Sequence, residues 1–206
     1  QGRGLRGFTP PAAPLDCGNS ATTIRLLAGA LAAAGTPCTL DGSAGLRRRP
    51  MDRITAPLLR MGVPITSNNG CAPLTLAARA TSHPLTAVDE TLPVASAQVK
   101  SCLILAALAA DGESTLREPG PSRDHTERML AAMGADIRVE GRAVTVAPLL
   151  QPLTPLRMTL PGDISSAAFL LVAAALVPGS ELCVRDVGVN PTRTGILDVL
   201  REMGAR

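Results

Sequence analysis

The residues of this 206-residue chain that could do chemistry are polar and basic side chains at the starts of apolar stretches. Lys100, the only lysine, stands close to Ser96 and Gln98 at the start of one stretch, and Arg25 follows Asn19 at the start of another. The free amide groups and positive dipole end of a helix attract anions, and an adjacent cation strengthens that preference. The pattern therefore predicts a phosphate or carboxylate ligand. The alternative is that Arg25 and Lys100 pair with acids or extend into solvent.

A run of three arginines, Arg47 to Arg49, precedes Pro50 at the expected start of a further helix. Positive charge is unfavourable at a helix start unless an anion lies nearby. A solvated surface is the usual position of such a run, and Arg49, which lies next to the helix start, is the strongest candidate for an anion contact.

A second cation occupies the equivalent position further along the chain. In residues 122–126, Ser122 or Asp124 can cap a helix, which leaves Arg123 able to reach an anion. We expect His125 to belong to the surface or to a capping network rather than to act as a base. The sequence shows no Ser-His-Asp set, no paired carboxylates and no glycine-rich phosphate loop of standard spacing.

Three segments that align without a gap predict the elements that position these side chains. Residues 19–35, 96–112 and 163–179 each hold a capping residue, a helix-prone stretch and a terminal glycine. The expected N-caps are Asn19, Ser96 and Asp163, and the expected ends are Gly35, Gly112 and Gly179. Because these stretches are apolar nearly all round, we expect three buried helices.

A second, half-exposed helix is predicted downstream of each buried one, within residues 49–62, 122–134 and 192–204. Residues 136–139 and 143–146 are predicted to form a hairpin around Gly141, and other short β stretches are expected at residues 38–40, 73–76, 114–116, 158–160 and 182–184. The predicted fold is therefore α/β (α+β), built from repeated β-α-β-α-β-β units. Prolines in residues 150–155 place a domain crossover at about residues 151–160.

Composition excludes several classes of protein. At 46% apolar and 18% charged residues the chain is not disordered, and its longest apolar run, residues 167–177, falls short of the roughly 20 residues needed to span a membrane. A net charge of +3 and only two aromatic residues argue against nucleic-acid binding. Five widely spaced cysteines predict reduced thiols in a cytoplasmic protein, not a zinc site or a disulfide framework. Because the chain opens on Gln1, we expect it to be cut from something larger.

Six ordered motifs resemble the 5-enolpyruvylshikimate-3-phosphate synthase family (3-phosphoshikimate 1-carboxyvinyltransferase), particularly its glyphosate-insensitive bacterial class. They lie at residues 15–27, 46–53, 92–101, 122–127, 161–167 and 190–195. The resemblance implies the enolpyruvyl transferase fold of two lobes, each with three repeats and buried parallel helices. Residues 1–155 would form most of the first lobe, which is two of its three repeats and the end of the preceding one. Residues 156–206 would form the first repeat of the second lobe.

The resemblance also implies an activity without metal or cofactor: transfer of the enolpyruvyl group of phosphoenolpyruvate to the 5-hydroxyl of shikimate 3-phosphate, with release of phosphate, in aromatic amino acid biosynthesis. The implied partners are these two substrates, not nucleic acid or membrane, and the full-length protein is expected to be a cytoplasmic monomer. The implied binding residues are Arg49, Ala21 and Thr22 for phosphoenolpyruvate, Ser96, Ala97 and Gln98 for shikimate 3-phosphate, and Arg123 for its phosphate group.

The sequence also departs from the family pattern. Family members are about twice as long, and neither their opening motif with its cleft lysine nor their second-lobe acid–base residues are present; Ile164 stands where a similar motif has lysine. We therefore expect no catalytic residue in this chain and no turnover by it alone. Two alternatives are a non-catalytic anion-binding module and the related transferase acting on UDP-N-acetylglucosamine. The reactive cysteine loop of that transferase has no counterpart among the five cysteines.

Overall fold

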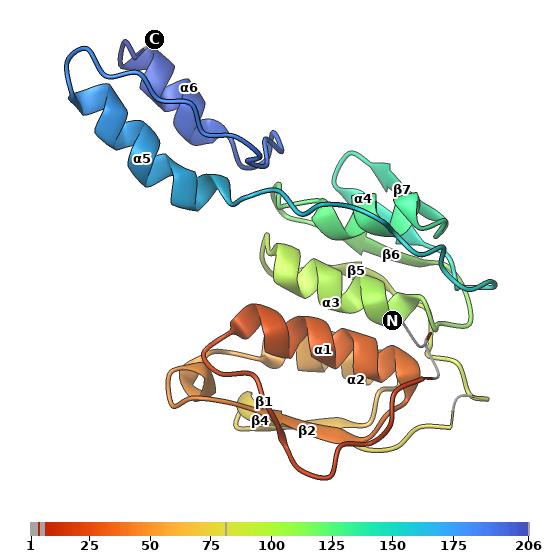
Figure 1. The fold of residues 1–206 in the computed structure, drawn as a ribbon. Coiled ribbons are helices and arrows are strands. Elements are labelled where there is room, and N and C mark those ends of the chain that lie inside the picture. The colour runs from red at the N-terminus through yellow and green to blue at the C-terminus, as the bar shows by residue number, and fades with distance from the viewer. Residues whose placement is uncertain (1–3, 5–6, 81, 206) are drawn as a thin grey trace. The chain divides into compact units, whose positions relative to one another are not determined.

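The computed structural model describes residues 4, 7–80 and 82–205 (Figure 1). The chain divides into two compact units, Gln1–Leu156 and Arg157–Arg206. None of the helices in the described ranges is long and apolar enough to cross a membrane.

The first unit contains the same order of elements twice. The first repeat comprises β1 (Leu15–Asp16), α1 (Ala21–Ala34), β2 (Cys38–Asp41), a 3-10 turn η1 (Leu46–Arg48), α2 (Asp52–Arg60), β3 (Ile65–Asn68) and β4 (Cys71–Leu76). The second comprises β5 (Asp89–Thr91), α3 (Ala97–Ala107), β6 (Ser114–Arg117), α4 (His125–Ala132), β7 (Ile137–Glu140) and β8 (Ala143–Val146). The β-α-β-α-β-β unit predicted from the sequence is present in both repeats.

The two sheets of the first unit have equivalent topology. Their strand orders are β1-β2-β4-β3 and β5-β6-β8-β7, in which the first pair is parallel and the other two pairs are antiparallel. Leu40 pairs with Leu74 in one sheet, and Leu116 pairs with Val144 in the other. All four of these side chains are buried in the core, which also contains most of α1 and α3. Figure 1 shows these two helices side by side.

The ends of α1 and α3 are set by local hydrogen bonds. Ser20, not Asn19, caps α1, because its hydroxyl oxygen accepts a bond from the Thr23 amide at 3.1 Å, and Asn19 lies next to it. Ser96 caps α3 as predicted. Gly35 closes α1 in the left-handed conformation, with φ of 67°.

The prediction that Gly112 ends the second buried helix is wrong, because α3 already ends at Ala107. The backbone beyond it turns away to form a parallel bridge between Ala110 and Leu85. The amide of Leu85 donates to Ala109 O at 2.8 Å, and the amide of Asp111 donates to Leu85 O at 2.7 Å. These bonds satisfy backbone groups that a longer helix would have used.

Hairpins complete both repeats. Gly141 turns between β7 and β8 as predicted, with φ of 60°. In the first repeat, β4 extends beyond the predicted stretch, and its partner β3 was not predicted from the sequence. Asn69 and Gly70 connect these two strands, and both have positive φ, as a tight hairpin turn requires.

The second unit contains α5 (Ile164–Leu176) and α6 (Gly195–Glu202). Asp163 caps α5 as predicted and accepts a bond from the Ser165 amide at 3.1 Å. The strands expected at residues 158–160 and 182–184 are absent from the described residues of this unit, where the backbone pairs instead in an isolated parallel bridge between Gly162 and Val187.

The expectation that α5 is buried is also wrong. Only Ile164 and Ala167 of this helix are buried, and the Phe169 side chain is 81% exposed. Within the described residues of the second unit, α5 packs against the amphipathic α6 and has no apolar helix beside it as α1 has α3. The helix ends before Gly179, at Leu176.

Candidate substrate-binding site

The first turns of α1 and α3 are joined by side chains. Gln98 donates from Nε2 to Thr22 Oγ1 at 2.8 Å and accepts at Oε1 from Arg25 Nη1 at 2.6 Å. Thr22 lies in the first turn of α1 and Gln98 in the first turn of α3. Both helices therefore present their N-terminal ends, with unpaired amide groups and positive dipole ends, at one place in the first unit.

Arg25 extends this cluster to the arginine run. Its Nη2 donates to Pro50 O at 2.8 Å, so that Arg49, the preceding residue, is held near the start of α1. The Arg25 side chain is buried, with 8% of the residue exposed. Burial lowers the pKa of Arg25, and the positive charges of Arg53 and Arg49 lower it further. The guanidinium groups of Arg49 and Arg53 thus both lie within electrostatic range of that of Arg25.

No acidic side chain in the described part of the chain is paired with any of these three arginines. Positive charges that repel one another and have no acidic partner are stabilised when an anion binds between them. The cluster is therefore suited to a phosphate or carboxylate group.

The other predicted binding residues at the two helix starts are the first residues of α1 and α3 and the residue that caps α3. Ala21 is the first residue of α1 and is buried, and Ala97 is the first residue of α3. Ser96 Oγ accepts from the Val99 amide, which leaves its hydroxyl hydrogen to donate to a ligand. The structure therefore brings together Thr22 and Gln98, places Ser96 and Ala97 beside Gln98, and ties Arg49 to them through Pro50 and Arg25.

Arg123 lies just before α4, and this residue is exposed. The first turn of α4 contacts α3, because Ser101 Oγ and Thr126 Oγ1 are 2.6 Å apart. Ser101 is about one turn beyond Gln98 along α3. No described contact joins Arg123 itself to the cluster, although its helix start is held against the same end of α3.

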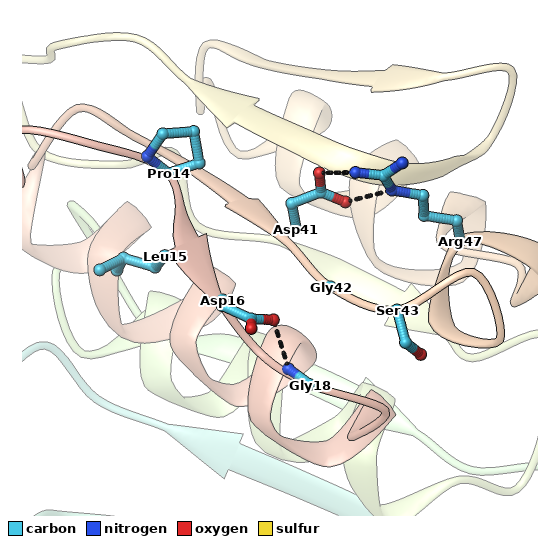
Figure 2. A pocket seen from close by; sticks show the side chains of 8 residues that line it. All are labelled: Pro14, Leu15, Asp16, Gly18, Asp41, Gly42, Ser43 and Arg47. Atoms are coloured by element: carbon cyan, nitrogen blue, oxygen red, sulfur yellow. Dashed lines mark hydrogen bonds and ion pairs between the residues drawn. The ribbon is translucent and has the colours of Figure 1, made fainter.

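Arg47, in the same arginine run, pairs with an acidic side chain and not with the cluster. It forms a two-pronged ion pair with Asp41, at 2.8 Å from Nε and 2.5 Å from Nη2 (Figure 2). This hydrogen bonding raises the pKa of Arg47 and lowers that of Asp41. Both residues line a cavity of about 390 Å³ that contains none of the predicted binding residues. Arg47 is therefore engaged with Asp41, whereas Arg49 adjoins the Pro50 carbonyl that Arg25 binds at the helix starts.

Lys100 does not face the cluster, and the alternative interpretation of this residue is confirmed. Its ammonium group is buried against Glu118 and Glu127, at 2.6 Å from each carboxylate. No local pattern in the chain indicates which acids meet this lysine. Within the described residues there is no group of three histidine, cysteine or acidic side chains that could hold a metal ion.

The sequence profile of the family described as EPSP synthase (3-phosphoshikimate 1-carboxyvinyltransferase) matches residues 1–206. The chain belongs to the EPSP synthase family. It is 52% identical, over 205 residues, to 3-phosphoshikimate 1-carboxyvinyltransferase of Methylococcus capsulatus, a match that covers 99% of this chain and 46% of that protein. The corresponding protein of Parasynechococcus marenigrum is 53% identical over 210 residues, with coverage of 100% and 47%.

Solved structures of EPSP synthase agree with the family assignment. A 2.37 Å structure of EPSP synthase from Acinetobacter baumannii matches with a TM-score of 0.88 and 43% identity, over 98% of this chain and 45% of that one. The mixed α/β fold is therefore the EPSP synthase fold. The chain spans a little under half of the length of the relatives that it matches.

Proposed function

We propose that this chain forms part of a 3-phosphoshikimate 1-carboxyvinyltransferase, which transfers the enolpyruvyl group of phosphoenolpyruvate to the 5-hydroxyl of shikimate 3-phosphate and releases phosphate. The observation that carries the proposal is the cluster at the joined starts of α1 and α3. There Thr22, Gln98 and Arg25 are linked by hydrogen bonds of 2.6 and 2.8 Å beside two further arginines. Membership of the family supports the same activity.

The two substrates divide this cluster between them in the proposal. Phosphoenolpyruvate, which carries a phosphate and a carboxylate, binds Arg49 and the start of α1 at Ala21 and Thr22. Shikimate 3-phosphate binds the start of α3 through the Ser96 hydroxyl, the backbone of Ala97 and the side-chain amide of Gln98. The phosphate group of this substrate pairs with Arg123. This last group of residues is Ser96, Ala97, Gln98 and Arg123.

Gln98 is the central residue in this arrangement. Its amide is already fixed at both ends, by Thr22 and by Arg25, so a ligand at either helix start meets a preorganised side chain. Preorganised donors bind a ligand without a further loss of side-chain freedom. The link also means that the two substrates are held in one geometry, which is what a reaction between two bound molecules requires.

We assign residues 1–155 to most of one lobe and residues 156–206 to the first repeat of the other lobe. The proposed role of this chain is substrate binding, and the acid–base chemistry belongs to residues outside it. We further propose that the protein works in the cytoplasm, in keeping with its five free cysteines, and that it is a monomer. Within the family we place it in the glyphosate-insensitive class, on the basis of its motifs and of Ala21.

The test is a comparison of Arg49→Ala with Arg48→Ala in the protein at its natural length. Both variants lose one arginine from the same run, and Arg48 serves as the control because only Arg49 adjoins the carbonyl held by Arg25. Loss of a charge-assisted hydrogen-bonded pair removes more than about 1.5 kcal/mol, so Arg49→Ala is expected to weaken the use of phosphoenolpyruvate by well over tenfold. Arg48→Ala is expected to change it less than twofold.

Steady-state kinetics with both substrates, together with calorimetric titration of each, separate the outcomes. Unchanged KM and kcat in Arg49→Ala would refute the assignment of Arg49. Binding of both substrates by the natural-length protein without any turnover would instead support a non-catalytic anion-binding module.

A further inference from the structure

Lys100, the only lysine in the chain, is buried in the second turn of α3. Its Nζ lies 2.6 Å from Glu118 Oε2 and 2.6 Å from Glu127 Oε1. The three side chains are 3%, 7% and 4% exposed. A lysine so placed has no access to a substrate, and the chemistry proposed for the chain makes no use of it.

The three buried groups hold one positive and two negative charges. In the described part of the chain the other two carboxylate oxygens, Glu118 Oε1 and Glu127 Oε2, are buried without a partner. Both carboxylates therefore depend on the same ammonium group. Burial by itself lowers the pKa of Lys100, but the hydrogen bonds to Glu118 and Glu127 outweigh it and raise that pKa above its ordinary value. The lysine is thus charged at neutral pH.

The two acids mark the ends of one segment. Glu118 follows the last residue of β6, and Glu127 lies in the first turn of α4. The connecting residues, 119–124, include Arg123. A single side chain from α3 consequently holds both ends of the segment that carries Arg123. The hydrogen bond between Ser101 and Thr126, at 2.6 Å, adds a second link between α3 and α4.

Stability alone does not explain such an arrangement. A buried ion pair contributes little net stability, because removing charges from water costs about as much as their attraction returns, and apolar side chains of similar size are often as stable or more stable. In some proteins a buried charged network fixes one specific geometry, which apolar packing does not. The geometry that this network defines is the position of residues 118–127 relative to the start of α3.

We propose that Lys100 is a positioning residue for Arg123. By binding Glu118 and Glu127 together, it fixes the segment between them so that Arg123 faces the phosphate of a shikimate 3-phosphate molecule held at Ser96 and Gln98. The proposal rests on the proposed function, and it adds a residue that acts on the binding of one substrate without touching it.

The single variant Lys100→Met leaves two carboxylates buried without a counter-charge and is expected to unfold readily. The decisive variant is therefore the triple one, Lys100→Met with Glu118→Gln and Glu127→Gln, which removes all three charges and keeps similar shapes. In the natural-length protein we expect it to fold, to lose about tenfold in affinity for shikimate 3-phosphate, and to keep its affinity for phosphoenolpyruvate within about twofold, as measured by calorimetry.

A double-mutant cycle with Arg123→Ala separates positioning from a merely structural role. If Lys100 acts through Arg123, the triple variant combined with Arg123→Ala binds shikimate 3-phosphate no more weakly than Arg123→Ala alone. The control is the pair Arg60→Met and Glu90→Gln, which removes an ion pair between α2 and β5 in which the arginine is half exposed. This control pair is expected to leave both affinities unchanged.

Three results would overturn this proposal but not the proposed function. A triple variant with wild-type affinity for shikimate 3-phosphate would do so, as would effects that add fully in the cycle or an equal loss for both substrates. If Arg123→Ala by itself weakens binding in these cases, the proposed function stands. An Arg123→Ala variant with unchanged affinity would overturn the assignment of Arg123 and, with it, this proposal.

Discussion

Gly29 lies directly against the backbone of Cys102, so close that a Cβ atom on residue 29 would overlap the carbonyl oxygen of Cys102. At this point α1 and α3 are in direct backbone contact, which only a residue without a side chain permits. The contact is two turns along α1 from Thr22. It brings the helices near enough for Gln98 to reach Thr22 at 2.8 Å.

We predict that Gly29→Ala destabilises the first unit. In an isolated helix this change is favourable by about 1 kcal/mol. Here the added methyl group forces two helix backbones apart, and overpacking of a buried contact costs about 1 to 3 kcal/mol or more. The expected result is a lower free energy of unfolding, measured by urea denaturation followed by circular dichroism.

Gly195→Ala is the control for that measurement, because a Cβ atom at the first residue of α6 meets no atom within 4 Å. We expect this variant to be as stable as the wild type or slightly more stable. If Gly29→Ala had the same free energy of unfolding as Gly195→Ala, the close approach of α1 and α3 would be wrong.

Arg25→Lys is expected to weaken the binding of both substrates by about tenfold while the fold is retained. The arginine reaches Gln98 and Pro50 with two separate nitrogen atoms, and a lysine ammonium on a flexible stem cannot reproduce that fork. Loss of one hydrogen bond to a charged group corresponds to about 1.5 kcal/mol or more. Calorimetric titration of each substrate into the natural-length protein would test this, with Arg60→Lys, an arginine outside the cluster, as a control of equal charge. A loss confined to one substrate would contradict the role of Arg25 as the link between them.

The cysteines are predicted to differ sharply in reactivity. Burial raises the pKa of the Cys102 thiol to about 12, and the pKa values of Cys17 and Cys38 are also raised, chiefly by burial. Cys183 is exposed. Because the thiolate is the reactive form, a disulfide reagent at about pH 8 should modify Cys183 within minutes and Cys102 only after unfolding.

Mass spectrometry of the modified protein identifies the residue, and Cys183→Ser should abolish the fast phase. Rapid modification of Cys102 in the folded protein would show that α3 is not buried as described.

Much of the fold could be predicted because its signals are local. The capping oxygens of Ser96 and Asp163 predict helix starts, and Gly141 predicts a hairpin turn. Each of these signals depends on only a few neighbouring residues. The exact cap of α1 could not be predicted, since Asn19 and Ser20 are both good caps and only the fold decides which one meets the Thr23 amide. The strands β1 and β5 are too short to show the alternation of apolar and polar residues by which a strand is predicted.

Burial was harder to predict than helix formation. An apolar sequence shows that α5 is a helix, but burial depends on what lies beside it, and Phe169 remains exposed. The same limit applies to the site. From residue type alone, an anion contact was predicted for Arg49 and for Lys100 alike. In the fold, however, Lys100 pairs with Glu118 and Glu127. The sequence does not show that the elements carrying these two acids pack beside Lys100.

Ala21 is the basis for a prediction about inhibition. It is buried as the first residue of α1, directly before Thr22, at the place proposed for phosphoenolpyruvate. A methyl group at this point narrows the space proposed for the ligand by about one carbon, and crowding of this size costs roughly 1 to 3 kcal/mol for a ligand that fills that space.

Glyphosate is longer than phosphoenolpyruvate, so the methyl group of Ala21 should oppose the inhibitor more than the substrate. We expect Ala21→Gly in the natural-length protein to increase sensitivity to glyphosate by roughly 10- to 200-fold, while the affinity for phosphoenolpyruvate stays equal or improves. Inhibition constants measured against phosphoenolpyruvate provide the test. Ala56→Gly, the same change at an exposed position of α2, is the matched control and should leave glyphosate inhibition unchanged. If the wild type and the Ala21→Gly variant were inhibited alike, the methyl group would not be the discriminating element, and insensitivity would have to be set by other residues.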